Sequence, residues 1–196
     1  MMKHLIVLAS LMLAFISGIL AQEKTTSGFS YGILYMAGGR YDNVRMCVAT
    51  GAGVKGGSIA DIMFLTKYTF SEKSAVTFNL PVMRPLLFGI AFQMLQFEPE
   101  FTFQYSKVLN DSKALLTGPG LGVSLNYGPD YKSDLKNRGD SFFAAGPFIS
   151  WQVGLEFRGS QKTRVVGIRA FYVPLSAKDH PDGSVLGGAL EYSVCF

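Results

Sequence analysis

The chain ends in the stretch LGGALEYSVCF, residues 186–196, in which two kinds of residue alternate strictly. One face of an extended chain would carry Leu186, Gly188, Leu190, Tyr192, Val194 and Phe196, and the other would carry Gly187, Ala189, Glu191, Ser193 and Cys195. Because successive side chains of a β-strand point to opposite faces, this pattern predicts a strand with one apolar face and one small or polar face.

The same alternation recurs along most of the chain. Ile149, Trp151 and Val153, for example, alternate with Ser150 and Gln152. No long segment shows the period of an amphipathic helix, so the chain is predicted to be all-β. The candidate strands are Phe29–Gly38, Ile59–Phe70, Ala75–Val82, Phe97–Val108, Lys113–Tyr127, Phe142–Phe157, Thr163–Leu175 and Ser184–Phe196.

Short and long connections alternate between these strands. The short polar turns are Ser71–Ser74, Leu109–Ser112 and Arg158–Lys162, and the longer connections are Gly39–Ser58, Met83–Gln96, Gly128–Ser141 and Ser176–Gly183. An antiparallel up-and-down meander with short turns at one end and long loops at the other is typical of a transmembrane β-barrel. We expect about eight strands, and ten are possible if Val44–Val48 also pairs.

Alternation alone does not say which face of the sheet points outward, because a soluble lipocalin-like barrel would be apolar inside. The apolar faces here are crowded with Phe, Tyr, Trp and Leu, whereas the opposite faces carry small residues such as Gly118, Gly120 and Gly122. Since the interior of an eight-stranded barrel is only wide enough for side chains to fill, the bulky set is predicted to face lipid.

The amino terminus has the pattern of a signal peptide. Lys3 precedes an uncharged apolar run from Leu5 to Leu20, and Ala21 ends a candidate cleavage site. We therefore expect residues 1–21 to be a signal peptide and residues 22–196 to form the barrel domain. A retained transmembrane anchor is the alternative, although the apolar run is near the shorter limit for spanning a bilayer.

With the signal, the alternation of turns and loops, and a last strand that ends in Tyr192-Ser193-Val194-Cys195-Phe196, the chain resembles small outer-membrane barrels of the OmpA and OmpX type. The resemblance implies an outer-membrane location and contact with outer-membrane lipid. It also implies that Tyr192 and Phe196 form the aromatic signal through which a barrel-assembly machinery recognises the last strand. No family-specific motif is matched, so the resemblance carries over no catalytic residue.

The charge and the cysteine count exclude several classes of function. The formal net charge is +4 and the basic residues are scattered, so no nucleic acid partner is expected. Two cysteines, Cys47 and Cys195, are too few for a disulfide-stapled fold, and with His180 they do not make a metal site, so no metal or cofactor is expected. The strand order places the two cysteines at opposite ends of the barrel, which predicts that no disulfide links them.

Several charged residues fall on the predicted inward faces. They are Lys67, Glu98, Glu100, Glu156, Arg169 and Glu191. Isolated ions inside the barrel would be costly to desolvate, so these residues should pair. Arg169 and Glu191 lie near the middle of the last two strands, which are antiparallel neighbours, and are predicted to form an ion pair. A lumen plugged by such pairs is expected, and a gated proton or ion path is the alternative.

Three features fit the barrel pattern less well. His180, with Ser176 and Ser184 nearby, resembles the parts of a lipid-modifying barrel enzyme, but a loop histidine flanked by aspartates, proline and glycine is more often a solvated turn, which is the expectation here. Met83–Gln96 is too apolar for an exposed loop and is expected to extend its flanking strands; covering the barrel mouth or binding a hydrophobic ligand are the other options. Pro119 lies well inside a strand and suggests a β-bulge or a wrong boundary.

Taken together, these features favour a non-catalytic outer-membrane barrel of structural or surface-interaction type. A narrow channel for small or hydrophobic solutes is the first alternative, and a lipid-modifying barrel enzyme is the second.

Overall fold

The computed structural model describes residues 28–43, 55–90, 94–129, 140–159, 162–178 and 182–196. The segment predicted to be a signal peptide, residues 1–21, lies outside these ranges. The elements are β1 (Gly28–Asp42), β2 (Gly56–Ser71), β3 (Ser74–Pro81), α2 (Met83–Ile90), β4 (Leu95–Phe97), β5 (Glu100–Asn110), β6 (Lys113–Pro129), β7 (Ser141–Arg158), β8 (Thr163–Ala177) and β9 (Gly183–Cys195).

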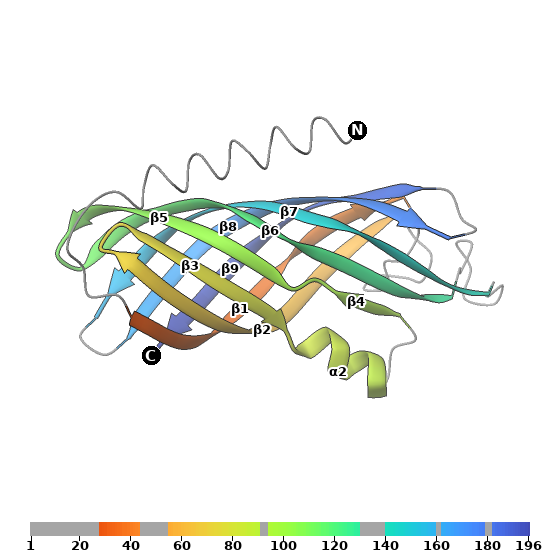
Figure 1. Ribbon diagram of the computed structural model, residues 1–196, viewed down its shortest axis with the longest axis horizontal. Helices are drawn as coiled ribbons and strands as arrows, with labels where there is room; N and C mark the ends of the chain where they lie inside the picture. Colours follow the sequence, from red (N-terminus) through yellow and green to blue (C-terminus); the bar gives the residue numbers. More distant parts are fainter. Residues whose placement is uncertain (1–27, 44–54, 91–93, 130–139, 160–161, 179–181) are drawn as a thin grey trace.

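The strands close into a ring, as Figure 1 shows. The order around the ring is β1-β2-β3-β5-β6-β7-β8-β9, β9 pairs back onto β1, and every pairing is antiparallel. The short strand β4 pairs with β6 in the register of β5, so β4 and β5 form one strand interrupted at Glu98 and Pro99. The prediction of an all-β, up-and-down antiparallel barrel with eight strands is therefore confirmed.

Most observed strands follow the predicted ones and are longer at the end where the longer connections lie, whereas β3 ends at Pro81, one residue before its predicted end. β1, for example, continues to Asp42, beyond its predicted end at Gly38. The segment Val44–Val48, which could have added strands, lies outside the described residues.

The apolar segment after β3 differs from expectation. Only Leu95–Phe97 extends a strand, whereas Met83–Ile90 form the helix α2, so the expectation that this segment lengthens both neighbouring strands is wrong for its first part. Two prolines explain the change. Pro81, the last residue of β3, has no N–H to continue a ladder, and Pro85 lies in the first turn of α2, where a proline is tolerated. Among the described residues, no helix is both long enough and apolar enough to cross a bilayer.

Large apolar side chains cover the outside of the barrel. Along β1, Tyr31, Ile33 and Tyr35 are exposed and alternate with buried residues, and Trp151 on β7 is 54% exposed. This confirms the predicted outward face. The inside is less purely small and polar than expected, because it also holds a buried apolar cluster. Its larger members include Leu34, Met36, Met63, Phe148, Phe171 and Leu175.

Pro119 marks an interrupted ladder rather than a bulge. The β5–β6 register is the same on both sides of it, but the pairs opposite Gly118 and Pro119 are missing. On its other side Pro119 still pairs with Trp151. Gly118 fits the narrow space beside the proline, since a Cβ atom there would lie 1.8 Å from the carbonyl oxygen of Phe103. The strand therefore continues through Pro119 to Pro129, so no boundary lies at this proline and the suggested bulge is wrong.

We expect Gly118→Val to lower the free energy of unfolding by about 1–3 kcal/mol, because the new side chain would force the backbone of Phe103 away. The measurement is urea-induced unfolding in lipid vesicles. Gly28→Val is the control, since nothing lies within 4 Å of a Cβ atom at Gly28. Equal stability of the two variants would contradict the close approach.

Candidate functional site: charged networks across the lumen

The first network centres on Arg169, which points into the lumen from β8. Its Nε donates to Glu191 Oε2 on the neighbouring strand β9 at 2.9 Å, which is the pair expected from the sequence. Its Nη1 pairs with Glu100, and its Nη2 donates to Gln152 Oε1 at 3.2 Å. All four side chains are buried. Glu100 belongs to β5, which is not a neighbour of β8, so Arg169 connects separate parts of the wall through the lumen.

Glu100 is held by further hydrogen bonds. Ser150 Oγ on β7 donates to Glu100 Oε1. Asn79 Nδ2 on β3 is 3.5 Å from Glu100 Oε2 and donates to Thr102 Oγ1 at 3.2 Å. The carboxylate therefore has hydrogen-bonding partners on both sides of β5, as a buried charge requires.

A second network lies near the short turns. Lys67 Nζ on β2 is 3.0 Å from Glu156 Oε2 on β7, and Arg158 Nε donates to Glu156 Oε1 at 2.6 Å. Arg158 also donates through Nη2 to the carbonyl oxygen of Glu72 in the β2–β3 turn, at 3.2 Å. Because β2 and β7 are separated by three strands on either side of the ring, the Lys67–Glu156 pair spans the lumen.

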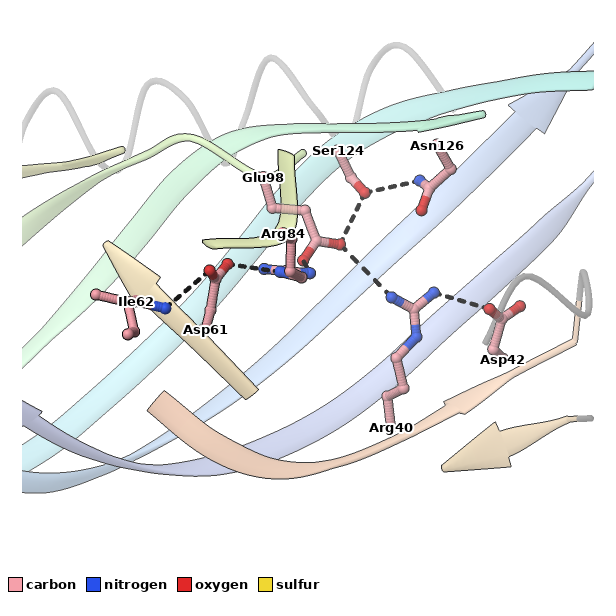
Figure 2. A network of polar contacts seen from close by, with 8 residues as sticks. All are labelled: Arg40, Asp42, Asp61, Ile62, Arg84, Glu98, Ser124 and Asn126. Atoms are coloured by element: carbon pink, nitrogen blue, oxygen red, sulfur yellow. Dashed lines mark hydrogen bonds and ion pairs between the residues drawn. The ribbon is translucent and has the colours of Figure 1, made fainter. Parts of the chain in front are cut away.

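Glu98 joins neither of these networks. It belongs to a third network toward the longer connections, shown in Figure 2, with Arg84 of α2 as a central member. Arg84 Nη1 donates to Glu98 Oε2 at 2.7 Å and Arg84 Nε donates to Asp61 Oδ2 at 2.5 Å. Ser124 Oγ donates to Glu98 Oε1 at 2.9 Å, and Asn126 Nδ2 donates to Ser124 Oγ at 2.9 Å.

Arg40 completes this third network. Its Nη2 is 2.8 Å from Asp42 Oδ2, and its Nη1 is 3.9 Å from Glu98 Oε1. Arg84 lies within ion-pair distance of both Glu98 and Asp61. Arg84 is therefore held as a cation between two carboxylates.

Sequence reasoning missed the four other charged members of the third network, Arg40, Asp42, Asp61 and Arg84, and also Arg158 of the second network. Asp61 could have been found, because it lies on the same predicted face as Lys67. Arg40 and Asp42 lie beyond the predicted end of their strand, although they continue its alternation. Arg84 gave no signal, since alternation says nothing about a residue in a helix.

The three networks contain five cations and six carboxylates. Within the described ranges, each carboxylate takes part in one ion pair, except Glu98 and Glu156, which take part in two. Such an arrangement is nearly neutral and places paired side chains across the lumen. Its groups are engaged with one another, which suits a structural plug better than chemistry on a substrate. Among the described residues, His, Cys, Asp and Glu form no group of three or more that could hold a metal ion.

The remaining predicted residues are placed as follows. Tyr192 and Phe196 are exposed on the outer side of the last strand. Cys195 is buried, and Cys47 lies outside the described residues, so the expected absence of a disulfide stays a prediction. His180 also lies outside them, while Ser184 is hydrogen-bonded through its N–H to Asn43 Oδ1 at 2.7 Å.

No family model matches the sequence, and a comparison with curated proteins finds no match. The fold is similar to the crystal structure of Neisserial surface protein A (NspA), with 11% identity, a TM-score of 0.58, and coverage of 87% of this chain and 97% of that chain. Ail, the attachment invasion locus protein of Yersinia pestis, matches with 14% identity, coverage of 88% and 100%, and a TM-score of 0.41. The likeness to NspA confirms the fold of a small outer-membrane β-barrel.

We expect Arg169→Met to lower the free energy of unfolding by about 3–5 kcal/mol, because it leaves Glu100 and Glu191 buried without their cation. Urea-induced unfolding in lipid vesicles measures the effect. Arg164→Met is the control, since Arg164 is exposed on the same strand and its loss should change stability by less than about 0.5 kcal/mol. A similar small change for Arg169→Met would show that the network adds little stability.

Proposed function

We propose that this protein is an outer-membrane barrel of structural or surface-interaction type, without catalytic activity and without an open channel. The main support is the set of ion pairs that cross the lumen. Arg169 reaches Glu100 in a buried pair, and the partly buried Lys67 and Arg84 reach the buried carboxylates of Glu156 and of Asp61 and Glu98. Because these side chains occupy the lumen, contacts with other molecules are expected at the ends of the barrel. The end with the longer connections is the natural place for them.

The outer surface supports the membrane location. Exposed aromatic residues lie toward both ends of the barrel, with Tyr41, Tyr127 and Phe143 near the longer connections and Phe29 and Phe196 near the short turns. Aromatic girdles flank the apolar band of outer-membrane barrels, where the rings lie at the lipid headgroups. The wall between them is apolar, and ring closure leaves few strand edges unpaired in the bilayer.

The closing of the barrel supports the role proposed for the last strand. The N–H of Phe196 donates to the carbonyl oxygen of Tyr31 at 2.8 Å, so the end of the chain is bonded to β1. Tyr192 and Phe196 point outward, where an assembly machinery could contact them before closure. We therefore retain that machinery and outer-membrane lipid as proposed partners.

The name of Neisserial surface protein A describes a surface protein, and the shared fold supports a surface role here. In this proposal the longer connections face the cell exterior and the short turns face the periplasm, the usual orientation of such barrels.

The plugged lumen predicts no steady conductance when the purified protein is inserted into planar lipid bilayers. A heat-dependent shift of mobility in detergent gels, which a closed barrel shows, serves as the control that the protein is folded. A reproducible unitary current from the heat-modifiable form would support the narrow-channel alternative instead.

The proposed orientation predicts the accessibility of inserted epitope tags. A tag between residues 130 and 139 should bind antibody on intact cells, whereas a tag between Glu72 and Lys73 should bind only after the outer membrane is permeabilised. The reverse pattern, or no binding at either position in heat-modifiable protein, would contradict the proposed topology.

A further inference from the structure

Exposed cations gather on one side of the barrel, between β5 and β8, at the end with the short turns. They are Lys107 of β5, Lys113 of β6, Lys162 directly before β8, and Arg164 of β8, and we call these four residues the basic patch. In the described part of this side, Asp111 in the β5–β6 turn is the one exposed carboxylate. Neither it nor any other described carboxylate forms an ion pair with the patch.

The strand register brings the basic patch together around an aromatic ring. Lys113 on β6 pairs with Phe157 on β7, and Phe157 pairs with Arg164 on β8, so the ring has a cation on each side. The Lys113 Nζ atom lies 5.8 Å from the centroid of that ring, and the Lys162 Nζ atom lies 4.8 Å from the centroid of the Phe196 ring. An ammonium group has three N–H donors, so a cation held at a ring can still donate to an anion.

The basic patch lies directly beside the apolar outer wall. Lys113, Phe157 and Arg164 each have an exposed apolar residue two positions further along their strand, on the same outer face. These neighbours are Leu115, Leu155 and Val166. Two residues of a strand span about 7 Å, and Lys and Arg side chains can reach from apolar surface to a polar layer. The cations are therefore placed where the headgroups of a bilayer begin.

The other side of the barrel differs at the same end. There the outer faces of β1 and β2 carry Phe29, Tyr68 and Phe70, with 4.7 Å between the ring centroids of Phe29 and Tyr68 and 4.8 Å between those of Tyr68 and Phe70. In the described parts of these two strands, no charged side chain faces outward at this end. Aromatic rings alone can hold a protein at a membrane interface, so the cations of the basic patch need a separate explanation.

The chemistry of the basic patch selects its partner. An anion is needed because the positive charge is not balanced by described carboxylates, and hydrocarbon is needed because Leu115, Leu155 and Val166 face the same way. An anionic phospholipid supplies both, and clustered Lys and Arg residues at a membrane surface attract such lipids. A soluble acidic protein would approach along the barrel axis and would meet the turns, including Asp111, before the outer face.

We propose that the basic patch binds the phosphate groups of anionic phospholipids in the leaflet at the short-turn end, with Lys113 and Arg164 on either side of Phe157 as its centre. The acyl chains of the bound lipid lie along the apolar wall beside these residues. The inference rests on the membrane location and orientation in the proposed function, which make this the periplasmic leaflet, and adds the class of lipid that the barrel prefers. Gel mobility and tag accessibility test location and orientation separately.

Photochemical crosslinking from inside the basic patch tests the proposal. Phe157→p-benzoylphenylalanine places a photoreactive ring between the two central cations. The matched control is Phe29→p-benzoylphenylalanine, at the same end on the side without cations, where Phe29 is 70% exposed. Each protein is folded into vesicles with equal amounts of phosphatidylglycerol and phosphatidylcholine that have the same acyl chains. After irradiation, mass spectrometry gives the ratio of the two lipid adducts.

The ratio of phosphatidylglycerol to phosphatidylcholine adducts should be about fivefold higher at position 157 than at position 29. It should fall toward the control value at about 1 M salt, because screening weakens exposed charge pairs. Adding Lys113→Gln and Arg164→Gln should lower the ratio at position 157 to that at position 29. Adding Lys55→Gln and Lys73→Gln instead removes two exposed cations outside the patch and should leave the ratio unchanged.

Four results would overturn the proposal. Equal ratios at the two positions would show that no anionic lipid is preferred at the patch, yet the lipid adducts themselves would uphold the membrane location. An unchanged ratio in a heat-modifiable Lys113→Gln, Arg164→Gln protein would remove the two central residues from the site. An equal fall with the control pair would mean that only net charge matters. Crosslinking of position 157 to a protein rather than to lipid in whole cells would identify a protein-docking surface.

Discussion

The pairing of charges across a narrow lumen is the constraint on which the rest of this structure depends. A closed ring of eight strands leaves an interior that side chains fill, so a charged residue there must find its partner on another strand. Arg169, Lys67 and Arg84 do this at three places along the barrel. The pairs of Arg169 with Glu100 and of Lys67 with Glu156 join strands that share no ladder, and Arg84 ties the helix α2 to the barrel. These pairs add a second set of links to the backbone hydrogen bonds.

Much of the fold could be predicted because apolar and polar side chains that alternate at every second residue indicate a β-strand. Alternation located every strand, and the size of the side chains on each face identified the outside. The pair of Arg169 with Glu191 was also within reach, since it depends only on two neighbouring strands and their register. The contact of Arg169 with Glu100 could not be predicted, because it depends on the tilt of the strands and on how the ring closes. Neither can be deduced from the sequence of a single strand.

The region around α2 could not be predicted for a related reason. An apolar segment between two strands has no period that separates a helix from a longer strand, and the prolines at 81 and 85 decide the outcome only through their positions. Arg84 consequently appeared to be a loop residue, and its partners Asp61 and Glu98 could not be connected with it.

The seam between β1 and β9 has a consequence for biogenesis. It joins the first and the last strand of the ring, for example at Tyr31 and Phe196, so the ring cannot close until β9 has been delivered. Contacts of such wide sequence separation form slowly and leave strand edges open to other chains in the meantime. A chain cut short before its last strand would expose the edges of both β1 and β8, which makes premature termination a route to aggregation and gives escorting factors in transit a clear target.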